Sequence, residues 1–425
     1  METTKKRGFA YGYILQIDVL LMFFLFAALT NDLFNVFPSM LSEMYGWDYS
    51  ATLSVATYAG YAGVVGTFIG SAIVQKKGNR FGAAQSMILC GVFAALFVRF
   101  PSLPAYLVLC CFMFFFAFQF GTVLTGTVTA AWFPRKRGVI LGFTSAGMCL
   151  SSCISPQIFV RLLNYMSLAN AVTVFAVVTI AVGVISIFWI KEHPEDIGLV
   201  PDGDDSNLED LKKTQEKLDK YKSPWTVGKL LKTPSVWTQA IGYGVLFMAT
   251  LGILGQWVPR AMEQGYTQAA ALNQLSVAAL CGIGFSILWG VVDFKLGTKK
   301  TSIIFCIWHI VATTILLLGV HSVVLTWIGI IMVGSTVGGI GNLGPSMIIR
   351  TFGRLDTPSA TKVIQTITNI LRVSAFAVVA LGLNIFGGFV PTYYIFIICG
   401  VVGLIMICLT KDKMIGTKDE EIEML

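Results

Sequence analysis

Charged residues are scarce in this sequence. Asp, Glu, Lys and Arg together make up 12% of its 425 residues, whereas they make up about 25% of a typical soluble domain. Hydrophobic residues make up 55%. This composition excludes an ordinary water-soluble fold and indicates a membrane protein, in which only helices or a closed barrel satisfy every backbone polar group.

The sequence also lacks the motifs of the common enzyme and metal-binding classes. It contains no phosphate-binding glycine loop, no His-Glu-x-x-His and no Gly-x-Ser-x-Gly. No Cys-x-x-Cys pair occurs among its nine cysteines, and His193, His309 and His321 are isolated. We therefore expect no enzyme activity, no metal and no cofactor.

Long apolar runs recur along the whole chain. They are continuous, which favours helices over the alternating strands of a membrane barrel, and they approach the roughly 20 residues needed to cross a bilayer. Twelve spans are predicted, near 11–36, 50–74, 83–100, 105–131, 139–163, 168–190, 235–259, 267–292, 301–319, 323–349, 362–384 and 391–410. The predicted fold class is therefore an all-α integral membrane protein of about twelve transmembrane helices.

One long polar segment divides these spans into six and six. The expected domains are an N-terminal six-helix bundle at 1–190, a cytoplasmic connector at 191–234 with a mixed-charge helical stretch at 207–222, and a C-terminal six-helix bundle with a short cytoplasmic tail at 235–425. No small-residue cleavage site follows the first basic residues, so the first span is not expected to be a signal peptide.

Basic residues fall on alternate loops, which sets the orientation. The loops of one side carry Lys5, Lys6, Arg7, Lys76, Lys77, Arg80, Arg135, Lys136, Arg137, Lys295, Lys299, Lys300, Arg350 and Arg354. The loops of the other side are poor in cations, where only Arg260, beside Glu263, stands out. Both termini are therefore expected in the cytoplasm, with the protein in the cell membrane, taken to be a bacterial inner membrane. The net charge of +7 thus orients the chain, and no nucleic-acid partner is expected.

Two loop motifs repeat with one spacing. The pattern Lys76-x-Gly78-x-Arg80 recurs as Lys295-x-Gly297-x-Lys299, and Phe133-x-Arg135 recurs as Phe352-x-Arg354. Both pairs are displaced by 219 residues (295 minus 76, and 352 minus 133). A common spacing in two independent loops indicates that a six-helix unit has been duplicated.

The loop QKKGNR at 75–80 resembles the loop signature of the major facilitator superfamily, with Gln75 where that signature carries Asp. The run WFPRKRG at 132–138, followed by GFTSAG at 142–147, is similar to the oxalate/formate antiporter and monocarboxylate transporter branch, as are PEDIG at 194–198 and LKTPSVW at 231–237. The resemblance implies a transporter with two bundles. The sequence departs from the branch in the eighth span, where Cys281, Gly284 and Ser286 stand in place of an Arg, and in the first span, which lacks the acidic-glycine motif.

Arg372 is the strongest candidate for a substrate contact. It lies about ten residues into its span, roughly 15 Å deep at 1.5 Å per residue and close to the midplane. Lys362, Gln365 and Asn369 share its helix face because they are spaced three or four residues apart. A guanidinium at this depth suits a carboxylate, although it could instead be a structural cation paired with a carbonyl or a buried acid.

Asp32, beside Asn31 in the first span, is the proton-coupling candidate. It lies about 21 residues into that span, so it could either carry a coupling proton or lie at the wet rim. Asp18 is expected to be a structural acid partnered by a basic loop residue. Asn31 is expected to contact the substrate.

Neutral side chains complete the predicted site. The substrate-binding candidates on spans that line the cavity of the resembled superfamily are Tyr58, Tyr61, Gln119, Gln256, Trp257 and Asn342. Each could instead serve packing or join two helices. Gly142, Ser145, Ala146 and Gly147 are expected to let helices approach closely during rocking and closure.

Three classes remain for the function: a secondary transporter, a membrane enzyme, and a channel or sensor. The connector is too short for a catalytic domain, and the duplicated halves favour the transporter. The leading interpretation is transport of a small organic anion, a monocarboxylate or dicarboxylate, by alternating access, with a proton or in exchange for a counter-anion. The alternative is efflux of an amphipathic compound. The protein is expected to act as a monomer.

Overall fold

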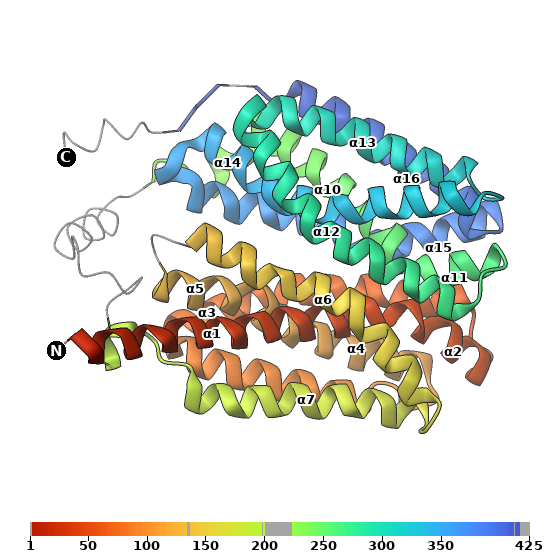
Figure 1. Cartoon of the computed structure of the whole chain (residues 1–425), viewed down its shortest axis with the longest axis horizontal. Helices are drawn as coiled ribbons and strands as arrows, with labels where there is room; N and C mark the ends of the chain where they lie inside the picture. The colour runs from red at the N-terminus through yellow and green to blue at the C-terminus, as the bar shows by residue number, and fades with distance from the viewer. Residues whose placement is uncertain (1, 134–136, 198, 200–222, 412, 417–425) are drawn as a thin grey trace. The chain divides into compact units, whose positions relative to one another are not determined.

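The computed structural model describes residues 2–133, 137–197, 199, 223–411 and 413–416, and every regular element in this part of the chain is a helix (Figure 1). The chain divides into two compact units, Met1–Leu208 and Glu209–Leu425. This division falls inside the range expected for the connector, 191–234. Residues 200–222 of that range, which include the expected helical stretch at 207–222, lie outside the described residues.

The first unit is built from seven α-helices and three short helical turns, all within its described residues. In chain order they are α1 (Glu2–Thr30), η1 (Asp32–Asn35), α2 (Phe37–Tyr45), α3 (Tyr49–Leu96), α4 (Leu103–Phe118), η2 (Gln119–Leu124), α5 (Thr125–Trp132), α6 (Arg137–Leu163), α7 (Leu168–Trp189) and η3 (Pro194–Ile197). Helix α3 has 48 residues, about 72 Å at 1.5 Å per residue, and the hydrocarbon core is about 30 Å thick. It therefore contains two spans, and the backbone breaks between them at Gly78.

The second unit repeats this pattern. Its elements are α9 (Val227–Leu231), α10 (Pro234–Gly255), α11 (Trp257–Glu263), α12 (Gln268–Leu296), α13 (Thr298–Leu318), α14 (Val323–Val373), α15 (Ala375–Phe386) and α16 (Phe389–Leu409). Helix α14 has 51 residues and breaks at Gly353. Its two segments are called α14a (residues 323–352) and α14b (354–373) below.

The glycines at these breaks share an unusual backbone conformation. Gly78 has φ 83° and ψ 171°, Gly297 has φ 81° and ψ 150°, and Gly353 has φ 73° and ψ 170°. Only glycine adopts this region readily. Gly78 and Gly297 are the pair related by the 219-residue spacing, so the repeat seen in the sequence is also a repeat of local structure.

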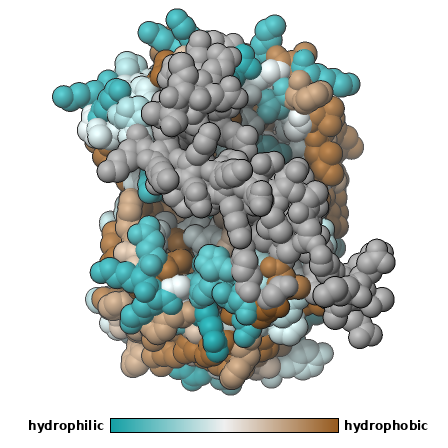
Figure 2. Space-filling model, turned by 90° about the vertical axis from the view of Figure 1, so that its left-hand side faces the viewer, coloured by the Kyte–Doolittle hydropathy of each residue, from teal (hydrophilic) through white to brown (hydrophobic). Residues whose placement is uncertain are grey.

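The predicted fold class is confirmed. Eleven helices of the described part are long and apolar enough to cross a membrane, and one of these is the double-length Tyr49–Leu96. Figure 2 looks onto the end of the molecule where α1 begins; hydrophilic side chains gather on this face, and hydrophobic ones lie along its edges. This is the distribution expected where helices leave the hydrocarbon layer.

Several predicted spans are divided in the structure, and one of these divisions changes the setting of a charged residue. The span expected at 235–259 ends earlier, at Gly255, and a separate helix, α11, begins at Trp257. Arg260 therefore lies in a helix and is buried, with 1% of its surface exposed, rather than in an open loop. Gln256 has φ −128°, outside the helical region, and this turn separates the two helices.

A hydrophobic core holds α10 and α14a together in the second unit. Tyr243 and Leu246 of α10 pack with Leu343 and Met347 of α14a and with Phe305 of α13. Gly244 of α10 lies against Leu371 of α14b, where an added Cβ would come within 2.6 Å of its Cδ1. The close approach of α10 to both segments of α14 positions the side chains of the site described next.

Candidate substrate site

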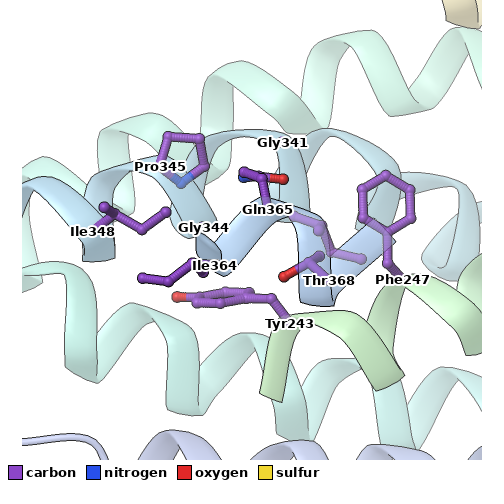
Figure 3. A pocket seen from close by; sticks show the side chains of 10 residues that line it. Tyr243, Phe247, Gly341, Gly344, Pro345, Ile348, Ile364, Gln365 and Thr368 are labelled. Atoms are coloured by element: carbon purple, nitrogen blue, oxygen red, sulfur yellow. The ribbon is translucent and has the colours of Figure 1, made fainter. Parts of the chain in front are cut away.

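A small cavity of the second unit lies between α10 and the two segments of α14 (Figure 3). Its volume is about 130 Å³, and it is lined by Tyr243, Phe247, Ile340, Gly341, Gly344, Pro345, Ile348, Ile364, Gln365 and Thr368. The lining is mostly apolar. In Figure 3 the side chain of Gln365 reaches from α14b toward Gly341 of α14a.

The predicted polar stripe of α14b reaches this cavity. Gln365 lines it, and Asn369 and Arg372 follow on the same helix face. The side chains of Gln365 and Asn369 make no hydrogen bond to a described residue, and both residues are half-buried. The stripe thus offers polar groups that the rest of the described unit does not use.

Arg372 is held in an apolar setting. Its side chain is 7% exposed, and its Cζ lies 4.7 Å from the centre of the Phe247 ring. Its Nε is fully enclosed and makes no hydrogen bond to any described residue, and no described acid forms an ion pair with it. A charge at this position is costly without a partner. Within the described residues, the guanidinium therefore has an aromatic neighbour and no acidic partner.

Asp32 lies in η1 of the first unit and is buried, with 6% of its surface exposed. Ser151 of α6 donates a hydrogen bond of 2.5 Å to Oδ2, and Ser152 donates one of 2.7 Å to Oδ1. Ser151 also lies 2.9 Å from Ser155 through their Oγ atoms. Asp32 is therefore enclosed by hydroxyl groups, rather than at the wet rim, and no described cation pairs with it.

Asp18 has a different partner from the one expected. Ser186 of α7 donates a hydrogen bond of 3.1 Å to its Oδ2, where the sequence suggested a basic loop residue. Asn31 precedes η1 and is half-buried; its backbone oxygen accepts a hydrogen bond of 3.2 Å from the amide of Phe34. Asn31 thus adjoins Asp32 at the point where α1 ends.

Gln119 begins η2, a π-helical turn inside a span. It is 2% exposed, and its Nε2 makes no hydrogen bond to a described residue. It packs on α3 at Gly70, where an added Cβ would come within 2.7 Å of its Cγ. Short π-helical turns occur often at functional sites, and Gln119 stays a prediction.

Two tyrosines on α3 are accessible. Tyr58 is 59% exposed and Tyr61 is 39% exposed. Their position keeps them as candidates for contact with a ligand or with lipid.

Three candidate residues of the second unit donate side-chain hydrogen bonds to other residues of that unit. Asn342 donates from Nδ2 to the carbonyl and the Oγ of Ser286, at 2.8 and 3.1 Å. Trp257 is fully buried and donates from Nε1 to Gln274 at 3.1 Å. Gln256 donates from Nε2 to the carbonyl of Gly255 at 2.5 Å. The contacts of Asn342 and Trp257 join two helices, which is the alternative considered for them from the sequence, whereas that of Gln256 is to the preceding residue.

The residues expected to let helices approach closely lie in the first part of α6. Gly147 packs against the backbone of Leu20 in α1, and an added Cβ would come within 3.2 Å of Phe23 Cβ. Ala146 is half-buried. The surroundings of Gly142 and Ser145 lie outside the described part, as do residues 134–136 with Arg135 and Lys136.

Sequence reasoning missed the partners of the charged groups. Nothing in the sequence marks Phe247 and Tyr243 of α10 as site residues, because aromatic residues are common in apolar spans. Ser151 and Ser152 are adjacent hydroxyl residues inside a span, and that pairing is a signal that could have placed them opposite a carboxyl.

Eleven candidate spans among the described residues, one of them of double length, in two units indicate a polytopic helical membrane protein. A family model described as Major Facilitator Superfamily matches residues 19–375. The chain belongs to this superfamily, and it is a transporter rather than an enzyme. No curated protein is similar enough in sequence to count as a match.

Solved structures share the fold at low identity. The crystal structure of a D-xylose–proton symporter has a TM-score of 0.70 at 12% identity, covering 95% of this chain and 100% of that one. The inward-open xylose transporter XylE from E. coli has a TM-score of 0.70 at 13% identity, with 97% and 99% covered. Its partially occluded inward-open form has a TM-score of 0.73 at 12% identity, with 93% and 98% covered. At these identities the likeness shows the shared fold, over 93–97% of this chain.

Proposed function

We propose that this transporter moves a small organic anion, a monocarboxylate or dicarboxylate, with Arg372 as its anchor. The observation that carries the proposal is a buried guanidinium that has an aromatic ring beside it and no acidic partner among the described residues. A carboxylate would supply the missing counter-charge and accept two parallel hydrogen bonds from the planar fork.

The surroundings of Arg372 fit a small ligand. Gln365 and Asn369 could hydrogen-bond the remainder of an acid from the same helix face. The cavity lined by Gln365 and Phe247 has a volume of about 130 Å³, roughly ten times what one water molecule needs by the same measure, so it suits a small acid. Phe247 excludes water from one side of the guanidinium, which strengthens its attraction for an anion.

We further propose that Asp32 carries a coupling proton in the first unit. Its carboxyl accepts hydrogen bonds from two neutral hydroxyls, Ser151 and Ser152, and from no described cation. Protonation would remove a charge at membrane depth, where charge is costly. Proton symport and exchange for a counter-anion both remain open within this proposal.

Finer assignments extend the same proposal. The loop motifs favour the oxalate/formate antiporter and monocarboxylate transporter branch, and the placement of cations favours cytoplasmic termini in a bacterial inner membrane. We propose a monomer as the working unit.

The alternative function is efflux of an amphipathic compound, for which the mostly apolar lining of the cavity is suitable. The sugar named for the structural neighbours, xylose, serves as a neutral comparison substrate.

Uptake into proteoliposomes tests the proposal. Labelled small monocarboxylates and dicarboxylates and labelled xylose would each be offered under an inward proton gradient, and separately to vesicles loaded with a counter-anion. We expect accumulation or exchange of at least one acid and none of xylose. Saturable transport of xylose without any acid would contradict the proposal, and export of amphipathic compounds alone would favour the alternative.

A further inference from the structure

A groove of about 670 Å³ lies on the first unit, between α3 near its break at Gly78 and the end of α7. These two helices pack side by side (Figure 1). The volume is within the roughly 300–1,000 Å³ typical of sites for small molecules. None of the substrate-binding or proton-coupling candidates lines this groove, so its ligand is a separate question from the transported substrate.

One end of the groove is positively charged. Lys77 and Arg80 line it, both are exposed, and neither forms an ion pair with a described acid. Nζ of Lys77 lies 4.4 Å from the centre of the Phe81 ring. Glu192, the acid among the lining residues, accepts hydrogen bonds from the amides of Asn79 and Arg80 at 2.7 and 2.9 Å. It therefore caps a helix instead of pairing with a cation, and this end of the groove has a net charge of +1 (two cations minus one acid).

The deeper walls of the groove are apolar. They include Ile88 and Leu89 of α3 and Ile187 of α7, all half-buried. Leu89 is nine residues beyond Arg80 (89 minus 80), about 14 Å along the helix at 1.5 Å per residue. Arg80 lies beside the break that separates two spans, where headgroups are expected, so these walls lie at the depth of the hydrocarbon core.

We propose that this groove binds an anionic phospholipid, such as phosphatidylglycerol, from the leaflet in which Lys77 and Arg80 lie. The phosphodiester contacts the two cations, and the upper part of one acyl chain lies along the apolar walls while the rest of the lipid stays in the bilayer. Charged and apolar ends follow one another along the helix in the same order as in a phospholipid. Basic residues at a membrane surface attract anionic lipids, and a zwitterionic lipid lacks the net charge that matches this end.

The bound lipid would connect two helices of the first unit. Its headgroup contacts α3 through Lys77 and Arg80, and its chain contacts α7 through Ile187. Glu192, which follows α7, already joins the two helices through the amides at the break. A ligand that binds only the folded state raises its stability with concentration, so anionic phospholipid should stabilise the protein.

Native mass spectrometry of the full-length protein, purified and delipidated in detergent, tests the site. Phosphatidylglycerol and phosphatidylethanolamine with the same acyl chains would be added in equal amounts. We expect about fivefold or greater preference for phosphatidylglycerol, the factor that one uncompensated cation near an anionic headgroup contributes. Lys77→Ala combined with Arg80→Ala should remove the preference. Lys295→Ala combined with Lys299→Ala is the matched control, because it removes two cations from the repeat-related loop of the second unit, and it should keep the preference.

Photocrosslinking locates the bound lipid. Phosphatidylglycerol with a diazirine in its acyl chain should label residues 81–89 or 184–192. Excess unlabelled phosphatidylglycerol should suppress this labelling, whereas glycerol phosphate, which has no chain, should not.

Four results would overturn the proposal. They are equal retention of the two lipids by the wild-type protein, loss of the preference in both double variants, suppression of the labelling by glycerol phosphate, and a dimer that depends on Lys77 and Arg80. The last result would show that a second copy of the chain covers the groove.

Discussion

Arg372 and Asp32 are both buried, but the groups around their charges differ. Asp32 accepts two hydrogen bonds from serines, so its carboxyl has protein partners in either protonation state. Among the described residues, the guanidinium of Arg372 contacts the face of the Phe247 ring and forms no ion pair. This difference is the reason for proposing substrate binding at Arg372 and proton handling at Asp32.

Replacing Arg372 by Lys tests how the anion is recognised. Lysine keeps the charge but loses the planar fork, so partial transport would indicate simple charge compensation and near-complete loss would indicate bidentate binding. We expect the larger loss, measured as the half-saturating concentration of the transported acid. Replacing the exposed Lys413 by Ala removes one charge away from the site and should leave that concentration unchanged. Wild-type affinity in the Lys variant would contradict the bidentate geometry.

Asp32→Asn should abolish proton-driven accumulation while exchange of labelled for unlabelled substrate continues. Exchange does not require the carboxyl to load and release a proton, whereas net uptake does. Asp18→Asn is the matched control, since Asp18 is buried to a similar extent and bonded to Ser186 but is not proposed to couple. Accumulation that survives in Asp32→Asn, or is lost equally in both variants, would eliminate Asp32 as the proton carrier.

The sequence predicts those properties of a residue that depend on its own helix alone. The depth and the helix face of Arg372 follow from counting residues along one span, and the structure places Gln365 of that face on a cavity. Contacts with other helices do not follow from such counting. For this reason the hydrogen bonds of Asn342 to Ser286 and of Trp257 to Gln274 could not be foreseen.

Breaks between helices depend on glycine. At Gly78 the carboxylate of Glu192 accepts hydrogen bonds from the amides of Asn79 and Arg80, at 2.7 and 2.9 Å. The carboxylate thereby caps the helical segment that starts after the break. Its negative charge is favourable there because a helix N-terminus carries a partial positive charge. The sequence located this loop through its repeated Lys-x-Gly pattern. It did not reveal Glu192, which comes from a loop more than 100 residues later.

Gly78→Ala should destabilise the protein by about 1–3 kcal/mol, because φ 83° is strained for any residue with a Cβ. The added Cβ would also lie 2.6 Å from Cδ of Glu192. Gly126→Ala, at a helical position with no atom within 4 Å of the new Cβ, is the control and should be neutral or slightly stabilising. Thermal unfolding midpoints in detergent would compare the two. Equal midpoints would show that the break at Gly78 is not fixed by glycine.

The topology of the whole chain rests on the cations of its loops. Single cysteines at Thr4 and Gly416, in a background without the nine native cysteines, should resist a membrane-impermeant thiol reagent applied to intact cells. A cysteine at Tyr165, which is 88% exposed between α6 and α7, should be labelled from outside. Labelling at either terminal position would contradict the proposed orientation.

The architecture was more predictable than the site. Apolar runs of span length and a shared 219-residue spacing are properties of the chain itself, and they predicted twelve spans in a fold class that the structure confirms. Boundaries were harder where no charge marks the end of a helix, as at Gln256, where one predicted span proved to be α10 and α11.

Competition between an acid and its amide in the same exchange assay tests the central claim most directly. The two compounds have nearly the same shape, so they differ mainly in the charge that Arg372 is proposed to bind. In the wild-type protein the acid should compete at least about 30-fold more strongly than the amide, since a buried charge pair is worth about 2–5 kcal/mol when one partner is removed. In Arg372→Ala that preference should disappear. An acid preference that survives in Arg372→Ala, with the variant folded and in the membrane, would contradict the account.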